Sequence, residues 1–120
     1  MSTPPVLHHV NLVVPKGRSE LIAAFYCDVF GVERVARPEN NERAGVWLDA
    51  GGTQIHLSER EGAPHPDVHI ALLDDDLSAV RVRLGEAGAE FQPAEDVFAT
   101  GGRGFTRDPA GNRLELINRG

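Results

Sequence analysis

The chain has 120 residues, enough for one domain with a single hydrophobic core. Apolar residues make up 41% of it and charged residues 25%, which excludes a disordered chain. Twelve basic against 18 acidic residues give a net charge of −6, which excludes an electrostatic surface for nucleic acid or for an anionic membrane.

Cysteine content and the start of the chain indicate a reducing compartment. Cys27 is the only cysteine, so no disulfide can form within the chain. The first ten residues lack the apolar segment and the cleavage site of a secretory signal, and no apolar run approaches the ~20 residues that cross a bilayer. We therefore expect a cytoplasmic protein.

The first half predicts a strand, a helix and three further strands. Residues 7–14 predict a strand with one buried face, because positions 10, 12 and 14 are apolar and positions 9 and 11 are polar. A helix is expected over 19–30, with Ser19 as its N-cap and Gly31 as its C-cap. Its buried stripe is predicted to be Leu21, Phe25 and Val29. The three short strands are expected near 32–36, 45–49 and 53–58.

The second half repeats this order. Residues 68–72 predict a strand, and Asp76 is expected to cap a helix that Gly88 ends. The buried stripe of this helix is predicted to be Leu77, Val80, Leu84 and Ala87. Strands are expected near 90–93, 103–107 and 113–118.

An internal alignment supports the repeat. Residues 44–59, written over 103–118, are identical at four positions: Gly45 and Gly104, Asp49 and Asp108, Gly52 and Gly111, Leu57 and Leu116. Three of these pairs lie in or beside turns, where backbone geometry restricts the residue type. The same offset places His56 over Glu115, and an offset one residue longer places His9 over His69. We therefore expect two modules, approximately 6–59 and 67–118.

Strand parity predicts that these four aligned side chains share one face. Alternate side chains of a strand point to opposite faces of a sheet. Since Val10, Leu12 and Val14 must face the helices, His9 faces away, and the same alternation directs His56, His69 and Glu115 away from their cores. Two modules side by side would curve the sheet around this polar face and gather the four groups in a cup.

A cup of this kind predicts one divalent metal ion as cofactor. Burying several ionisable groups is costly unless a partner compensates their charge. Imidazole and carboxylate ligands suit Zn, Ni, Co, Mn or Fe, and the ligand types do not choose among these. Three or four protein ligands leave coordination positions open for water or substrate, as in catalytic metal sites.

The chain resembles the vicinal oxygen chelate superfamily, which includes glyoxalase I, extradiol dioxygenases, fosfomycin-resistance enzymes, methylmalonyl-CoA epimerase and bleomycin-resistance proteins. The segments that carry the resemblance are 9–14, 25–31, 55–57, 69–72 and 108–116. It implies an α+β fold in which two βαβββ modules form a curved, cup-shaped mixed sheet with helices on the outer face. It also implies that the metal ligands are His9, His56, His69 and Glu115, and that the chain forms a homodimer.

Position 56 departs from the known members of this superfamily. Glyoxalase I-like members carry Glu there and the epimerase carries Gln, whereas dioxygenases and fosfomycin enzymes use two His and one Glu. The latter set would be His9, His69 and Glu115. His56 is then either a fourth ligand or a general base, because an imidazole pKa near neutrality suits proton transfer. His56 and Glu115 are the candidate catalytic residues.

The predicted function is a divalent-metal-dependent enzyme that acts on a small substrate through two adjacent oxygens, with glyoxalase-like lyase or isomerase chemistry. The candidate substrate-binding residues are Arg113, Asn11 and Trp47. Arg113 shares the face of Glu115 and could bind an anionic group. Two alternatives remain, an Fe(II) extradiol-type dioxygenase and a non-catalytic drug-binding protein of the bleomycin-resistance type. We expect a small-molecule partner and neither nucleic acid nor membrane.

Overall fold

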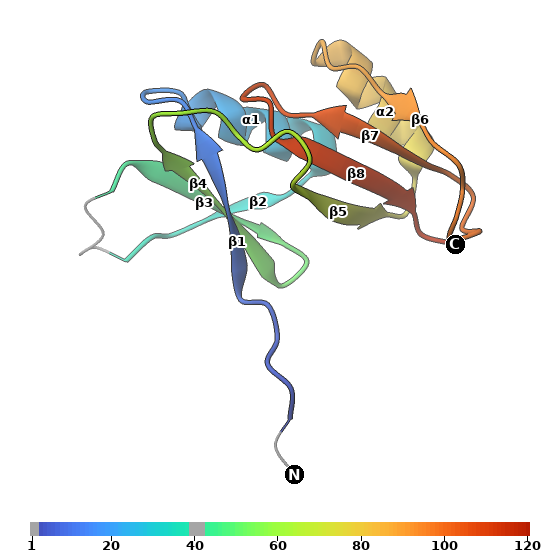
Figure 1. Ribbon diagram of the computed structural model, residues 1–120, viewed down its shortest axis with the longest axis horizontal. Helices are drawn as coiled ribbons and strands as arrows, with labels where there is room; N and C mark the ends of the chain where they lie inside the picture. The colour runs from blue at the N-terminus through green and yellow to red at the C-terminus, as the bar shows by residue number, and fades with distance from the viewer. Residues whose placement is uncertain (1–2, 39–42) are drawn as a thin grey trace.

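The computed structural model describes residues 3–38 and 43–120 and shows an α+β fold of two modules (Figure 1). The first module consists of β1 (His9–Val14), α1 (Ser19–Phe30), β2 (Glu33–Val35), β3 (Gly45–Ala50) and β4 (Thr53–Glu59). The second consists of β5 (His69–Asp74), α2 (Leu77–Glu86), β6 (Gln92–Pro93), β7 (Arg103–Arg107) and β8 (Arg113–Asn118). The element order predicted for both halves is confirmed.

Each module forms its own four-stranded mixed sheet. The strand orders are β1-β4-β3-β2 and β5-β8-β7-β6. In both sheets the first strand pairs in parallel with the last, and the other pairs are antiparallel. A parallel pair needs a long crossover, and the helix of each module lies on that crossover. The two identical topologies confirm the internal repeat.

Glycines at equivalent positions of the two halves explain part of the similarity between the two modules. A Cβ on Gly45 would overlap the carbonyl oxygen of Leu57, and a Cβ on Gly104 would overlap the ring of Phe91. Gly52 and Gly111 have φ values of 100° and 93°, in the left-handed region that favours glycine. The same turn geometry therefore acts at Gly52 and Gly111, whereas Gly45 and Gly104 are confined by different neighbours.

One hydrophobic core serves both modules. It contains Ile22, Tyr26 and Val29 of α1, Val80 and Leu84 of α2, and the inward residues of the strands, which are Val14, Val46, Leu48, Ile55, Leu57, Leu114 and Leu116. The alternation predicted for β1, β4 and β8 is thereby confirmed. Figure 1 shows both helices on the same side of the sheets, so the other faces are open. In the described parts of the chain, no helix is long and apolar enough to span a membrane.

Helix α1 begins differently from the prediction. Arg18 is the N-cap, without a side-chain hydrogen bond, and Ser19 is already helical. The Ser19 hydroxyl donates to Glu59 on β4 at 2.5 Å, so a tertiary partner replaces the predicted cap. Leu21, predicted to be buried, is 50% exposed. The C-cap prediction is confirmed, because Gly31 has φ of 70° and donates its N–H to the Cys27 carbonyl.

Helix α2 follows its prediction closely. Asp76 is the N-cap and its side chain accepts a hydrogen bond from the Ala79 N–H at 3.1 Å. Leu77, Val80 and Leu84 are buried. Ala87 is exposed because the helix ends before it, so its predicted place on the buried stripe is wrong.

The turn between β7 and β8 connects the modules. The Tyr26 hydroxyl of α1 donates to Asp108 at 2.7 Å, and the Asn112 side chain donates to the Val13 carbonyl of β1 at 3.0 Å. Asp108 and Asn112 are buried. Burial and the neighbouring Asp108 carboxylate raise the pKa of Tyr26 well above its ordinary value, so this phenol remains a proton donor.

Candidate functional site

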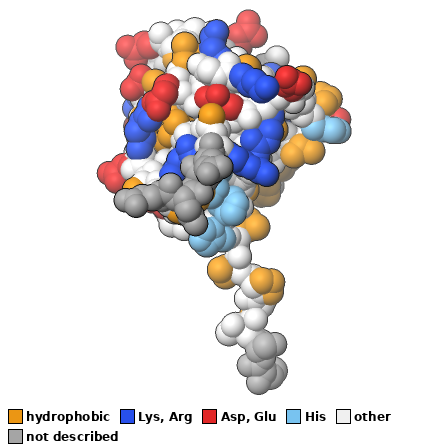
Figure 2. Space-filling model, turned by 90° about the vertical axis from the view of Figure 1, so that its left-hand side faces the viewer, with side chains coloured by type: hydrophobic (Ala, Val, Ile, Leu, Met, Phe, Trp, Pro, Cys, Tyr) orange, Lys and Arg blue, Asp and Glu red, His pale blue; other side chains and the backbone are white. Residues whose placement is uncertain are grey.

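The open face of the first sheet carries a column of three stacked rings. The ring centroids of His9 and His56 are 3.9 Å apart, and those of Trp47 and His56 are also 3.9 Å apart. Trp47 and Asn11 lie directly opposite His56 on the two neighbouring strands. Figure 2 shows histidine side chains gathered where the N-terminal segment leaves the body of the molecule. Four predicted site residues of the first module therefore lie together on one face.

His56 is the buried member of the column. It is 5% exposed, and its Nε2 lies 2.8 Å from Gln54 Oε1, to which it donates. Burial, followed by the positive charges of neighbouring histidines, lowers the pKa of His56 to about 4. At neutral pH the ring is therefore uncharged, and its Nδ1 keeps a lone pair.

Acid titration of the metal-free protein is expected to change the emission of Trp47, the only tryptophan of the chain, with a midpoint near pH 4. The reason is that protonation of His56 places a cation on the face of the indole ring. The unfolded chain binds this proton with a pKa of about 6.5. The contribution of His56 to stability is therefore complete above pH 6.5 and is lost as the pH falls towards 4. A midpoint near 6.5, or an unchanged titration in His56→Gln, would contradict this assignment.

The open face of the second sheet is a grid of nine side chains centred on Glu115. Strands β5, β8 and β7 each contribute three of them: His69, Ala71 and Leu73; Arg113, Glu115 and Ile117; and Arg107, Phe105 and Arg103. Glu115 is only 7% exposed although it faces the open side, because the surrounding side chains cover it.

Both oxygens of Glu115 are engaged. Oε1 lies 3.0 Å from His69 Nε2, and Oε2 accepts a hydrogen bond from Arg103 Nε at 2.7 Å. The hydrogen bond from Arg103 lowers the pKa of Glu115 below its ordinary value, and His69 acts in the same direction, whereas burial opposes them. The Glu115 side chain is therefore an ionised carboxylate held in a fixed orientation.

The contacts of His69 fit those of a metal ligand. Its Nδ1 lies 2.9 Å from the Asp67 carbonyl oxygen, which can only accept, so Nδ1 carries a hydrogen. Metal-bound histidines are commonly oriented by such a bond. Nε2 then faces a carboxylate oxygen, and a proton or a cation must lie between the two. Ligand atoms at ~2.0–2.2 Å from one ion lie roughly 3 Å apart, as these two atoms do.

The four predicted ligands form two separate pairs. His9 lies against His56, and His69 lies against Glu115. Within residues 3–38 and 43–120, no three His, Cys, Asp or Glu side chains lie close enough to hold one metal ion. The gathering of all four groups in one cup is thus not present inside a single chain.

Arg103 and Phe105 were not among the predicted site residues. Arg103 orients Glu115, and the Phe105 ring lies beneath the Arg113 guanidinium, 4.0 Å from ring centroid to Cζ. The signal that could have found them is the alternation within β7, because residues 103, 105 and 107 share the face of Glu115.

The chain is similar to one protein family and to several solved structures. The family model of the Glyoxalase/Bleomycin resistance protein/Dioxygenase superfamily matches residues 6–116. A solved structure assigned to the glyoxalase family, from Bacillus anthracis, is 25% identical with a TM-score of 0.86, over 100% of this chain and 99% of that one. No curated protein matches the chain in sequence.

Two further solved structures share the fold at lower identity. A mutant of the fosfomycin resistance protein FosX from Listeria monocytogenes, in complex with Mn(II) and a dihydroxypropylphosphonic acid, is 18% identical with a TM-score of 0.82, over 98% of this chain and 95% of that one. TnmS3, an antibiotic binding protein from Streptomyces sp. CB03234, is 18% identical with a TM-score of 0.77, over the whole of both chains.

Proposed function

Because the chain belongs to the Glyoxalase/Bleomycin resistance protein/Dioxygenase superfamily, we propose that it is a divalent-metal-dependent enzyme acting on a small oxygen-chelating substrate. The observation that carries the proposal is the His69–Glu115 pair, in which His69 Nε2 lies 3.0 Å from an ionised carboxylate while the Asp67 carbonyl orients the same ring through Nδ1. FosX, which shares the fold, was solved with Mn(II).

We propose further that the metal site is shared between two copies of the chain. Each sheet offers two candidate ligands, which is fewer than the three or four of catalytic sites. In a two-fold dimer, His9 and His56 of one copy would complete the site of His69 and Glu115 in the other. Leu7, two residues before β1, and Val68, directly before β5, are 73% and 69% exposed and offer apolar surface for this contact.

The residues of the chain have distinct roles in this site. The ion supplies Lewis-acid stabilisation of negative charge that develops on a substrate oxygen. Asp67 orients His69, and Arg103 keeps the Glu115 carboxylate ionised and in place. A pKa of about 4 makes His56 a weak base at neutral pH, so we favour it as the fourth ligand over the general base. Asn11 and Trp47 lie beside it as candidate substrate contacts.

Divalent metal ions are expected to stabilise the protein against heat. At ~100 times the dissociation constant, binding adds about 2.7 kcal/mol, which raises the Tm of a domain of this size by about 10 °C. Glu115→Gln, which keeps the shape but removes the ligand charge, should abolish the increase. Glu86→Gln on α2 is the matched control and should retain it. No increase with Zn, Ni, Co, Mn or Fe, or an equal increase in Glu115→Gln, would refute metal dependence.

The metal that the protein retains distinguishes the two enzymatic candidates. Stable Zn, Ni or Co in protein purified with and without oxygen would support lyase or isomerase chemistry. Iron that is retained only without oxygen would support the dioxygenase. Carbonyl compounds and catechols are the substrates to screen first, because both present two adjacent oxygens.

A non-catalytic binding protein is the second candidate, and a cavity of about 840 Å³ favours it. Its lining combines both modules and includes the apolar side chains of Val10, Ile55, Ile70 and Leu72. The volume is within the range of small-molecule sites. TnmS3, an antibiotic binding protein, shares the fold. Protein that purifies without metal, gains no stability from metal ions, and yet binds an apolar cationic compound would support this candidate.

A further inference from the structure

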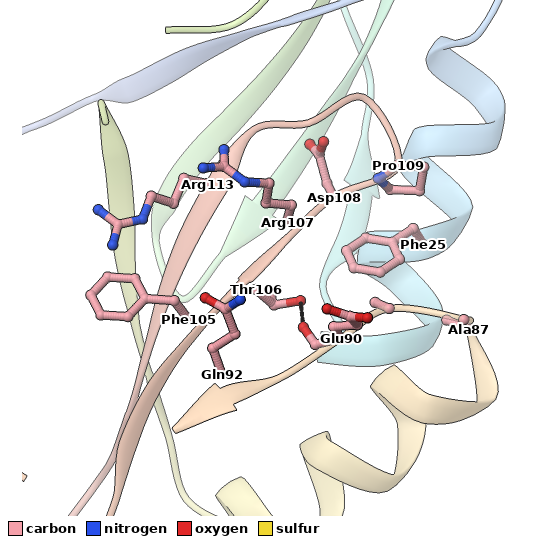
Figure 3. Close-up of a pocket in the computed structure, with 12 residues that line it drawn as sticks. Phe25, Ala87, Glu90, Gln92, Phe105, Thr106, Arg107, Asp108, Pro109 and Arg113 are labelled. Carbon is pink, nitrogen blue, oxygen red and sulfur yellow. Dashed lines mark hydrogen bonds between the residues drawn. The ribbon is translucent and has the colours of Figure 1, made fainter. Parts of the chain in front are cut away.

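Two arginines lie side by side on the open face of the second sheet. Arg107 on β7 and Arg113 on β8 are direct partners in the strand register, and Figure 3 shows their side chains beside each other. Like charges directly opposite each other on neighbouring strands are destabilising. This pair therefore costs free energy unless an anion neutralises it.

The neighbouring acidic groups do not neutralise the pair. Glu115 is the carboxylate of the grid, and its two oxygens are taken by His69 and Arg103. Arg107 donates to the backbone carbonyls of Gly111 and Pro66, which carry no net charge. Arg113 makes no hydrogen bond or ion pair with any residue that the structure describes.

Phe105 holds the Arg113 guanidinium in place while its N–H groups stay free. The Arg113 Cζ lies 4.0 Å from the ring centroid, which is a cation–π contact. Stacking uses the face of the guanidinium and leaves its edge, with the N–H donors, available for two-pronged binding of an oxyanion. The arrangement is thus pre-ordered for an anionic ligand.

The two arginines also line a cavity of about 400 Å³, shown in Figure 3. Gln92, which is paired with Phe105, and the segment 87–90 form its other side. The volume suits a small molecule. Glu90 and Asp108 also line this cavity, but among the described residues neither forms an ion pair with Arg107 or Arg113. The Asp108 carboxylate is taken by Tyr26, Ala110 and Asn112, so the two guanidinium groups remain without a carboxylate partner.

We propose that Arg107 and Arg113 form an oxyanion-binding subsite, which takes a carboxylate or phosphoryl group of the ligand. Arg113 lies opposite His69 and two residues before Glu115, so the subsite adjoins the proposed metal ligands. Taking this ligand as the substrate rests on the proposed function. The substrate class is then a small anionic molecule whose charged group lies beside its chelating oxygens.

The test uses the full-length chain after treatment with a chelator, titrated separately with propionate and with inorganic phosphate. Side-chain Nε–H signals of the arginines are followed by NMR. We expect the signals of Arg107 and Arg113 to shift, and the dissociation constant to rise about tenfold in Arg113→Gln and in Arg107→Gln. Arg113→Lys should lose less affinity for the anion, because lysine keeps the positive charge. A response to propionate alone identifies a carboxylate ligand, and a response to phosphate alone identifies a phosphoryl ligand.

Arg81→Gln is the matched control, because Arg81 lies over Phe91 at 4.4 Å in the same kind of contact but on α2. It should bind both anions as the unaltered chain does. Equal binding by Arg113→Gln and Arg107→Gln, or equal shifts at Arg81, would overturn the subsite. Because these titrations contain no metal, they stand apart from the metal assay. Anion binding without metal binding would retain the subsite and refute the proposed enzyme.

Discussion

A heterodimer of one His9→Ala chain and one Glu115→Gln chain is expected to bind about half the metal of the unaltered dimer, whereas neither variant binds metal as a homodimer. The reason is geometric, because the candidate ligands of one chain lie as two pairs on two separate sheets. In the shared arrangement, each site takes His9 and His56 from one chain and His69 and Glu115 from the other. One site of the heterodimer therefore contains both substitutions, and the other site contains neither. The heterodimer is purified through two different affinity tags, and its metal content is measured per dimer.

The matched control is a heterodimer of the His9→Ala chain with an otherwise unaltered chain. It should hold about half the metal whether the sites are shared or lie within one chain. This control therefore shows that tagged heterodimers can bind metal. If the control binds while the heterodimer of His9→Ala with Glu115→Gln binds nothing, each site lies within one chain and the shared arrangement is wrong. Finding that the protein is monomeric at micromolar concentration would also exclude the shared arrangement.

Sequence periodicity was sufficient to predict the elements and the faces of the strands. The alternation in β1, β4 and β8 depends only on neighbouring residues, and it placed His9, His56 and Glu115 on the open faces. The repeat is detectable because the same turn constraint acts in both modules, as at Gly52 and Gly111.

The remaining features depend on contacts between distant segments. Ser19 has the chemistry of an N-cap, but Glu59, 40 residues away, takes its hydroxyl. Arg103 acquires its role only because β7 pairs with β8 and brings it to Glu115. The separation of the candidate ligands into two pairs depends on how the two sheets lie relative to each other. Local periodicity carries no information about that relation.

Asp108 presents the largest expected loss of stability. Its buried carboxylate accepts four hydrogen bonds, from the Tyr26 hydroxyl, the backbone N–H groups of Ala110 and Asn112, and the Asn112 side chain, at 2.7 to 3.0 Å. Tyr26 is fully buried, so after the carboxylate is removed its hydroxyl would have no water to accept its hydrogen bond. Because Asn112 also binds Val13 of the first module, the loss would loosen the contact between the modules.

We expect Asp108→Ala to lower the free energy of unfolding by about 3–5 kcal/mol, a large part of the 5–15 kcal/mol typical of small domains. Tyr26→Phe, which removes one donor, should cost about 1–2 kcal/mol. Asp49, the equivalent residue of the first module, makes no side-chain hydrogen bond within the described residues, so Asp49→Ala should stay within about 0.5 kcal/mol. Urea unfolding followed by circular dichroism measures all three. Equal losses at positions 49 and 108 would mean that turn geometry, rather than the buried carboxylate, stabilises this junction, because the two residues occupy equivalent places in the repeat.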